Sequence, residues 1–313
     1  MIERLVAMQA QSPQAPYVGI WTRATSFRRD ALEAELARAA VVRTTAIRQT
    51  LHLVTRRDYA LLRAALSKTN FPSDSSLAQR LAPELRALAA DGPLTSADAL
   101  AYLEREHGLT GRDARLAWQQ TRVRAHLVPH FESALWQAGR DSRYVALEEP
   151  EVHDPTGARA EILGRYLSAF GPSTRRDIGA WSMLHMPEIH RALERLEPLR
   201  RFRDEQGREL LDVPRAPLPD PETAAPVRLL PKWDNVLLAW ADRTRILPEE
   251  HRKKVIRMNG DVAQTFLVDG FVAGIWRLEE GKVVADPFEP LPPSTRQEVE
   301  EEAGRLEAFV AAP

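Results

Sequence analysis

Two glutamines near the start of the chain, Gln9 and Gln11, have a type and spacing that could support catalysis. A glutamine amide carries both a carbonyl acceptor and an N–H donor, so a pair of them could hold a water molecule. Two glutamines two residues apart are nevertheless usually a polar surface feature. His52 lies in an apolar run, where a histidine is more often packed or hydrogen-bonded than an acid or a base. Spacing alone therefore assigns no chemistry to these residues.

Metal and cofactor chemistry finds little support in the sequence. His126 and His130 are four residues apart, as two ligands on one helix would be, but Pro129 between them would break that helix. The absence of cysteine excludes a disulfide, a Cys-ligated zinc site and an iron–sulfur cluster. Neither G-x-x-x-x-G-K-[ST] nor G-x-G-x-x-G occurs. We expect no metal and no cofactor.

The charge of the chain is balanced overall but uneven locally. The formal net charge is −1, which is unlike a small DNA-binding domain. Between residues 43 and 63, however, five arginines stand against one acid, Asp58, and the segment 252–257 holds four basic residues and no acid. These segments could bind phosphate, or they could be ordinary solvated helices.

The targeting signals that a sequence can reveal are missing. The first residues lack a basic head followed by an apolar run, and nowhere do about 18 apolar residues run together. We expect a cytoplasmic protein that associates with the nucleoid.

One rhythm, short helices followed by a pair of strands, recurs three times along the chain. The first case is a helix over 28–40 with strands over 41–47 and 49–54. The second has helices from 95 to about 106 and over 110–125, then strands over 134–137 and 144–147 around a turn at 139–142. The third has helices over 158–170, 173–181 and 187–197, then strands over 199–203 and 209–213. Three helices followed by a hairpin is the winged-helix order.

The remainder of the chain has a different pattern. A linker rich in Pro and Ala covers 214–226, and strands are predicted over 262–268, 271–277 and 282–288. The first two are joined by Asp269 and Gly270, a strong turn signal, and a closing helix over 294–310 has Ser294 as its expected cap. We predict an α+β fold, mostly α: tandem winged-helix units at 1–90, 91–150 and 151–215, and a β-rich C-terminal domain at 227–313.

A set of short segments resembles one family from end to end. The chain is similar to the winged-helix DNA glycosylase family (AlkZ/YcaQ-like) in six segments that follow in the family's order: 8–11, 48–54, 229–234, 242–244, 267–270 and 274–277. Each segment is weakly specific alone, and the ordered set is fairly specific. The resemblance departs at Gln49, where the family has glycine. It also places Met1 inside the helix expected to carry the glutamines, where relatives have a further basic segment.

The resemblance implies a fold and an activity. Tandem winged helices with a β-rich C-terminal part would curve around duplex DNA, forming an open cleft. Members are monofunctional glycosylases that remove bulky N7-alkylated purines and unhook interstrand crosslinks, and self-resistance to a genotoxic natural product is one setting for this. The motif is Gln-x-Gln in the AlkZ-like branch and Gln-x-Asp in the YcaQ-like branch, so Gln9-Ala10-Gln11 matches the AlkZ-like branch.

The resemblance also assigns residues. Gln9 and Gln11 would jointly place the attacking water as the catalytic pair. Since no lysine lies near them in the sequence, a hydrolytic reaction is favoured over a lyase. We expect a monomer that binds duplex DNA carrying alkylated or crosslinked purines. Its expected contacts to DNA are Arg43, Arg48, His52, Arg56, Lys232, Arg252, Lys254 and Arg277.

Two other functions stay open at this point. A winged-helix protein can bind DNA without catalysis, as a transcription regulator does, because fold does not imply function. A structural protein with an idle groove is the third possibility.

Overall fold

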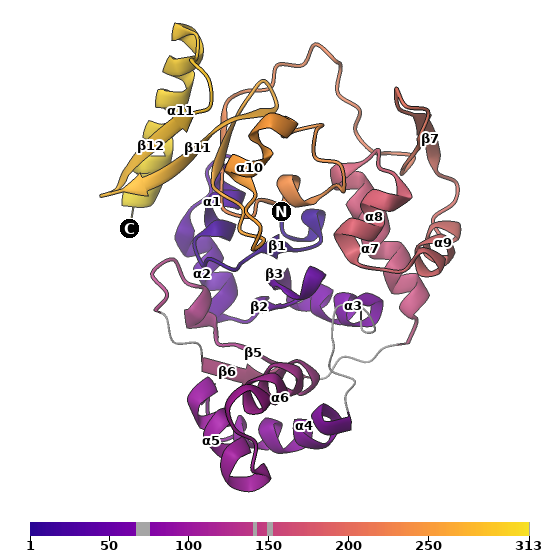
Figure 1. Ribbon diagram of the computed structural model, residues 1–313, viewed down its shortest axis with the longest axis vertical. Coiled ribbons are helices and arrows are strands. Elements are labelled where there is room, and N and C mark those ends of the chain that lie inside the picture. Colours follow the sequence, from indigo (N-terminus) through magenta and orange to yellow (C-terminus); the bar gives the residue numbers. More distant parts are fainter. Residues whose placement is uncertain (67–75, 140–142, 149–152, 313) are drawn as a thin grey trace.

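The computed structural model describes residues 1–66, 76–139, 143–148 and 153–312. The first helices and strands lie at the centre of the view in Figure 1, with α4–α6 at one end of the molecule. Helices α7–α9 lie on one side of this centre and the C-terminal strands with α11 on the other. The N-terminal segment is therefore surrounded by later parts of the chain.

The central unit builds a small sheet between helices. Its strands are β1 (Met8–Gln9), β2 (Val41–Thr45) and β3 (Leu51–Thr55), in the sheet order β1-β3-β2. Between β1 and β2 lie α1 (Ala15–Trp21) and α2 (Arg29–Ala37), and α3 (Arg56–Leu66) follows β3. The last strand of the unit thus lies in the middle of its sheet.

The second unit repeats this topology. It begins with α4 (Ser76–Leu88) and has the strands β4 (Leu94–Thr95), β5 (Leu127–Pro129) and β6 (Arg143–Ala146) in the order β4-β6-β5. Helices α5 (Ser96–His107) and α6 (Gly111–Arg124) lie between β4 and β5. Thr95 and Asp98 form a capping box at the start of α5, and Gly108 ends the helix in the left-handed conformation. The unit has its own apolar core, which contains Leu85, Leu103 and Trp118.

The third unit has the same order with a reduced first strand. It contains α7 (Pro155–Phe170), α8 (Arg175–Ser182), α9 (Met186–Glu194), β7 (Arg200–Arg203) and β8 (Glu209–Asp212). Ser173 makes a single bridge to Leu211 of β8, at the place where the other two units have their first strand. All three units therefore share one arrangement of strands around a middle strand that comes last in sequence.

The C-terminal region is a four-stranded sheet covered by one helix. Its strands are β9 (Arg228–Leu230), β10 (Thr265–Val268), β11 (Phe271–Glu279) and β12 (Lys282–Pro287), in the order β12-β11-β10-β9. The short α10 (Arg252–Val255) precedes β10, and α11 (Pro293–Ala311) closes the chain. Asp269 and Gly270 both have positive φ and form the two-residue turn of the β10–β11 hairpin, as predicted.

Three expectations from the sequence are wrong. The glutamine motif is not on a helix, because Met8 and Gln9 form β1. The strand predicted over 134–137 does not pair with β6, whose partner is β5, and Phe131–Ala134 is a 3₁₀ helix. Ser294 makes no capping bond, since Pro292 occupies the cap position of α11.

The predicted turn at 139–142 lies mostly outside the described residues.

Within the described ranges, no helix combines the length and apolar character needed to cross a membrane. The same residues contain no cluster of His, Asp and Glu side chains that could hold a metal ion.

Candidate active site around Gln9 and Gln11

The first sheet places Gln9 beside two other polar side chains. In the antiparallel ladders, Gln9 is opposite His52 and His52 is opposite Thr44. Residues directly opposite each other share one face of a sheet, so Gln9, His52 and Thr44 form a polar row across the three strands. All three are buried, whereas Gln11 is exposed. The motif therefore reaches from the interior to the surface.

The amide of Gln11 has a fixed orientation. The backbone N–H of Leu51 donates to Gln11 Oε1 at 2.9 Å, and Ala10 N donates to the Leu51 carbonyl at 2.7 Å. Because a backbone N–H can only donate, the atom of Gln11 that faces it must be the oxygen. The Nε2 amino group of Gln11 is consequently turned away from the strand, as a donor.

Thr50 controls the amide of Gln9. Its Oγ1 lies 3.1 Å from Gln9 Oε1 and 3.1 Å from the carbonyl of Ile47. The hydroxyl has one proton, and the Ile47 carbonyl can only accept. The proton therefore goes either to Gln9 Oε1 or to the Ile47 carbonyl. When it goes to Ile47, the oxygen of Gln9 is available as an acceptor, while Gln11 offers its amino group.

Two side chains from other parts of the molecule hold the backbone of the motif. Asn235 Nδ2 donates to the Ala7 carbonyl at 2.7 Å, and Asn235 Oδ1 accepts from Gln9 N at 3.4 Å. Next to Asn235, Asp234 makes a two-point ion pair with Arg23 of the first unit, at 2.8 and 2.6 Å. The segment that follows β9 therefore holds the start of the chain in place.

Arg43 is the second support, and it is buried. Its guanidinium donates to the carbonyls of Ala10 (3.0 Å), Ser133 (2.8 Å) and Gln11 (3.3 Å). Burial lowers its pKa below the usual arginine value. Arg43 therefore holds the backbone of the motif, and its predicted contact to DNA stays a prediction.

His52 has a neutral ring at physiological pH. Its Nδ1 lies 2.9 Å from the Thr50 carbonyl, which can only accept, so Nδ1 carries the proton. Burial, together with a smaller effect of the charge of Arg48, lowers the pKa of His52 to about 3. With 2% of its surface exposed, His52 lies in the interior of the first sheet, and its predicted contact to DNA stays a prediction.

Arg48 and Gln49 form a tight corner before β3. Both have φ in the left-handed region, 54° and 59°, which costs a residue with a Cβ roughly 1 kcal/mol or more. Arg48 donates to the carbonyl of Trp181 in α8 at 3.1 Å. Burial lowers the pKa of Arg48 to about 10, so it keeps its charge at neutral pH. The corner thus joins the first unit to the third.

The other predicted contacts to DNA have partners within the protein. Arg56 lies 3.7 Å from Glu148, Arg252 lies 3.8 Å from Glu249 and Arg277 pairs with Glu279. Lys254 lies over the ring of Phe288 at 4.8 Å. These pairs are on the surface, where ion pairs are weak and can exchange for phosphate.

Lys232, the remaining predicted contact, lines a cavity next to the glutamines. This cavity, the motif hollow, has a volume of about 190 Å³. Ser12, which follows Gln11 directly, lies at its wall together with Trp136 and Trp276. Lys232 is paired with Asp261 at 2.9 Å. The sequence did not indicate this cavity, because its walls come from six separate segments of the chain.

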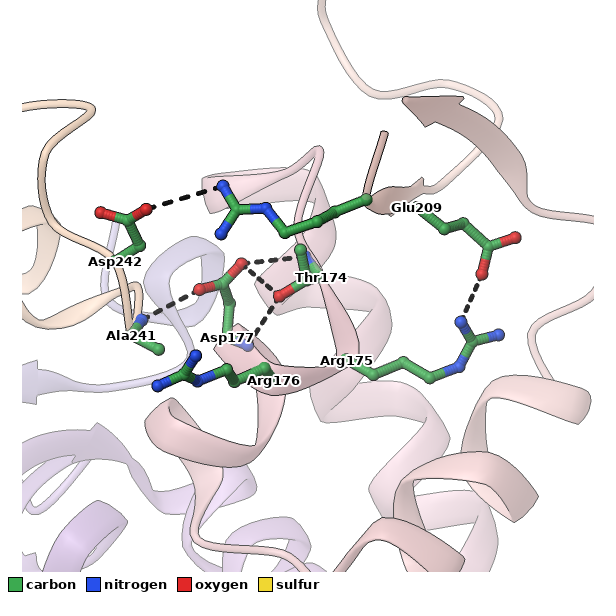
Figure 2. A pocket seen from close by; sticks show the side chains of 8 residues that line it. Thr174, Arg175, Arg176, Asp177, Glu209, Ala241 and Asp242 are labelled. Carbon is green, nitrogen blue, oxygen red and sulfur yellow. Dashed lines mark hydrogen bonds and ion pairs between the residues drawn. The ribbon is translucent and has the colours of Figure 1, made fainter. Parts of the chain in front are cut away.

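A second cavity lies at the start of α8, between the third unit and the segment around Ala241 (Figure 2). This arginine pocket has a volume of about 560 Å³. Asp177 closes the helix start by a capping box with Thr174 and accepts from Ala241 N at 2.9 Å. Arg175 pairs with Glu209, as Figure 2 shows. The walls also include Arg176, Arg208 and Asp242.

Comparisons with known proteins agree with this architecture. The family model described as "DNA glycosylase AlkZ-like" matches residues 2–309. A curated relative from Streptomyces sahachiroi, named an interstrand DNA cross-link repair glycosylase, is 23% identical over 98% of this chain and 89% of its own length. The solved structure of the Streptomyces sahachiroi DNA glycosylase AlkZ matches with a TM-score of 0.78 at 21% identity, covering 99% of this chain and 90% of that one. With a family match over nearly its whole length, this chain belongs to the AlkZ-like DNA glycosylase family.

Proposed function

We propose that this protein is a monofunctional DNA glycosylase that hydrolyses the N-glycosidic bond of bulky N7-alkylated purines and unhooks interstrand crosslinks. The family of this chain and the name of its curated relative support this reaction. The observation that carries it is the arrangement of Gln9 and Gln11, whose amides are fixed by Thr50 and by Leu51 N.

The three repeated units are, in this proposal, winged helices that bind duplex DNA as a monomer. Their shared strand order supports this, with two helices between the first and second strands. We propose that they correspond to the predicted units at 1–90, 91–150 and 151–215, except that α4 belongs to the second unit, whose apolar core it shares. The β-rich domain at 227–313 follows. The exposed cations Arg56, Arg252, Lys254 and Arg277, with Lys232, would contact phosphates.

The chemistry explains why neutral side chains suffice. Alkylation at N7 gives the purine a positive charge, so the C1′–N9 bond breaks with its electron pair moving to N9. The base leaves neutral, and the sugar becomes an oxocarbenium-like cation. Water adds to C1′ and releases a proton to solvent, which leaves an abasic site. The leaving group needs no strong acid, and the cation needs no strong base.

Gln9 and Gln11 divide the task of placing that water. Gln9 Oε1 accepts one water proton when Thr50 donates to Ile47. Gln11 Nε2 donates to the water oxygen, because its own oxygen is held by Leu51 N. The two bonds orient a lone pair of the water toward C1′, an effect worth on the order of 10²-fold or more in rate. His52 stays neutral behind them and contributes no positive charge that would repel the sugar cation.

The test is base release from a duplex with a single N7-methylguanine, and from a defined interstrand crosslink, measured by mass spectrometry of the freed base. We expect Gln9→Ala and Gln11→Ala each to release base on the order of 10²-fold more slowly than wild type. Gln297→Ala, which changes an exposed glutamine of α11, is the matched control and should keep full activity.

Each outcome decides between the candidate functions. A wild-type protein that binds the duplex tightly but releases no base would be a non-catalytic DNA-binding protein, for example a regulator. Full activity of both alanine variants would show that the catalytic residues lie elsewhere.

A further inference from the structure

The motif hollow is built for an apolar guest. Its wall carries the indole rings of Trp136 and Trp276 with Leu278 and Val310 as aliphatic neighbours. These side chains come from the segment before β6, from β11 and from the end of α11. Aromatic walls with few polar groups are typical of sites for small molecules.

Three of the polar groups at the wall already have partners within the protein. Ser12 Oγ donates to Gln14 Oε1 at 2.8 Å, and Gln14 Nε2 donates to the carbonyl of Trp136 at 2.8 Å. Trp276 Nε1 donates to the carbonyl of Leu230 at 2.9 Å, and Gln264 lines the hollow as well. A ligand group with a hydrogen-bonding edge, such as an ordinary DNA base, would lose its water contacts and find few replacements. An apolar group loses none.

The volume limits the size of the guest. A closed apolar cavity of about 150 Å³ is known to bind benzene, and whole drug-sized ligands need about 300 Å³ or more. At about 190 Å³, the motif hollow holds one aromatic ring. It therefore suits one part of a ligand whose remainder lies outside.

The position of the hollow indicates which part of the ligand lies outside it. Ser12 at its wall is the residue next to Gln11, and consecutive Cα atoms are 3.8 Å apart. The wall of the hollow therefore begins one residue after the motif, although Gln9 and Gln11 do not line it themselves. For this reason we place in it a group attached to the base rather than the base itself. Lys232, paired with Asp261 at the rim, adds a positive charge near the sugar–phosphate backbone.

We propose that the motif hollow binds the aryl group of a purine alkylated at N7 by an arylmethyl substituent. This inference rests on the proposed function and names its substrate class. Stacking between the ring and the indoles holds the damaged base, so that the enzyme selects adducts with an aromatic substituent over adducts with a methyl group. The geometry also explains how a lesion too large for an enclosed base pocket is accommodated.

The experiment compares two duplexes that differ only in the substituent: one N7-methylguanine and one N7-benzylguanine. The measured quantity is the ratio of the enzymatic rates of release, benzyl over methyl, each corrected for spontaneous loss. Leu278→Trp fills the hollow from the sheet and Val310→Trp fills it from the helix. Because both side chains are at least partly exposed, one variant can replace the other if a protein fails to fold.

We expect each filling variant to lower the benzyl-to-methyl ratio about tenfold or more, since loss of a pocket contact of this size is worth 10-fold or more in specificity. Phe271→Trp is the matched control. Phe271 lies on β11 like Leu278, is 49% exposed, and does not line the hollow. It should leave the ratio unchanged.

The outcomes separate this inference from the proposed function. If wild type releases neither base, the proposed function fails and this inference fails with it. If wild type releases N7-methylguanine but not N7-benzylguanine, or both with a ratio that the filling variants leave unchanged, only the aryl site is overturned. A ratio that falls equally in Phe271→Trp also overturns it.

Discussion

The motif hollow and the arginine pocket differ in size and in chemistry. The arginine pocket is about three times larger, at about 560 Å³ against about 190 Å³. Its wall is charged, and two of its three arginines are paired with carboxylates: Arg175 with Glu209 (Figure 2) and Arg208 with Asp242. The motif hollow has an apolar wall beside two amides held by neutral hydrogen bonds.

The difference shows that volume is a poor guide to the site of a reaction. Exposed ion pairs cost little to form and little to lose, so the arginine pocket demands no ligand to explain it. Around the glutamines, in contrast, a buried arginine, a buried histidine and an asparagine from a distant segment all bind backbone carbonyls of the motif and its neighbours. A backbone held in one position by several side-chain hydrogen bonds is typical of a catalytic site.

The largest expected effect is on stability, when an arginine near the glutamines is replaced and compared with one in the arginine pocket. Arg43→Met leaves three buried carbonyls without their donor, and we expect it to lower the free energy of unfolding by about 2–4 kcal/mol. Arg175→Met breaks an exposed pair and should cost less than about 1 kcal/mol. Urea denaturation of both variants measures this. Equal losses would contradict the distinction drawn between the two regions.

Removal of the hydroxyl that orients Gln9 should affect catalysis more than stability. Thr50→Val abolishes the bonds to Gln9 and Ile47, and we expect the rate of base release to fall about tenfold. Thr50→Ser restores the hydroxyl and should restore most of the rate. Steady-state kinetics on N7-methylguanine duplex decides this, and a serine variant as slow as the valine variant would show that Thr50 acts by packing alone.

Acid should destabilise the two regions in different pH windows. The pKa of His52 falls from its usual 6.5 to about 3 on folding, so its contribution to stability is complete above pH 6.5 and is lost as the pH falls toward 3. The pKa values of Glu209 and Asp242 are lowered by their arginine and threonine partners, so their contributions are complete above the usual carboxyl pKa and are lost as the pH falls from there through the lowered values.

Stability measured from pH 7 to pH 4 checks these windows. His52→Phe should flatten the loss between pH 6.5 and 4.5, while Glu209→Gln should leave that loss in place. A wild-type protein whose stability is constant down to pH 4.5 would contradict the assignment of a buried neutral histidine.

The smallest expected effect is a gain. Gln49 has a left-handed backbone and an exposed side chain. Gln49→Gly should raise the free energy of unfolding by up to about 1 kcal/mol, since glycine adopts this conformation without strain. Thermal unfolding measures the change, and a loss of stability would indicate that the Gln49 side chain supports the corner.

Much of the architecture is readable from the sequence because local signals mark it. The helices of the third unit and the Asp269–Gly270 hairpin have caps, glycines and turn residues at their ends. Strand β1 has two residues and β5 has three, too few for any periodic pattern to show. They form because distant strands offer them hydrogen bonds, which no local window contains.

The site divides in the same way. The family resemblance pointed to Gln9 and Gln11, but their surroundings depend on contacts between remote segments. The arginine-rich segment around Arg43 predicts a contact to DNA, but no local pattern shows that its guanidinium binds three carbonyls of the protein. Asn235 sits more than two hundred residues from the backbone it holds, and nothing in its local sequence signals that role.

The central claim is that Gln9 and Gln11 act on the chemical step by placing water. Single-turnover base release from an N7-methylguanine duplex, at enzyme concentrations that saturate the DNA, isolates this step from binding. We predict that Gln11→Ala slows the single-turnover rate on the order of 10²-fold while its Kd for the same duplex stays within a few-fold of wild type. An unchanged single-turnover rate, with any loss confined to Kd, would contradict the account.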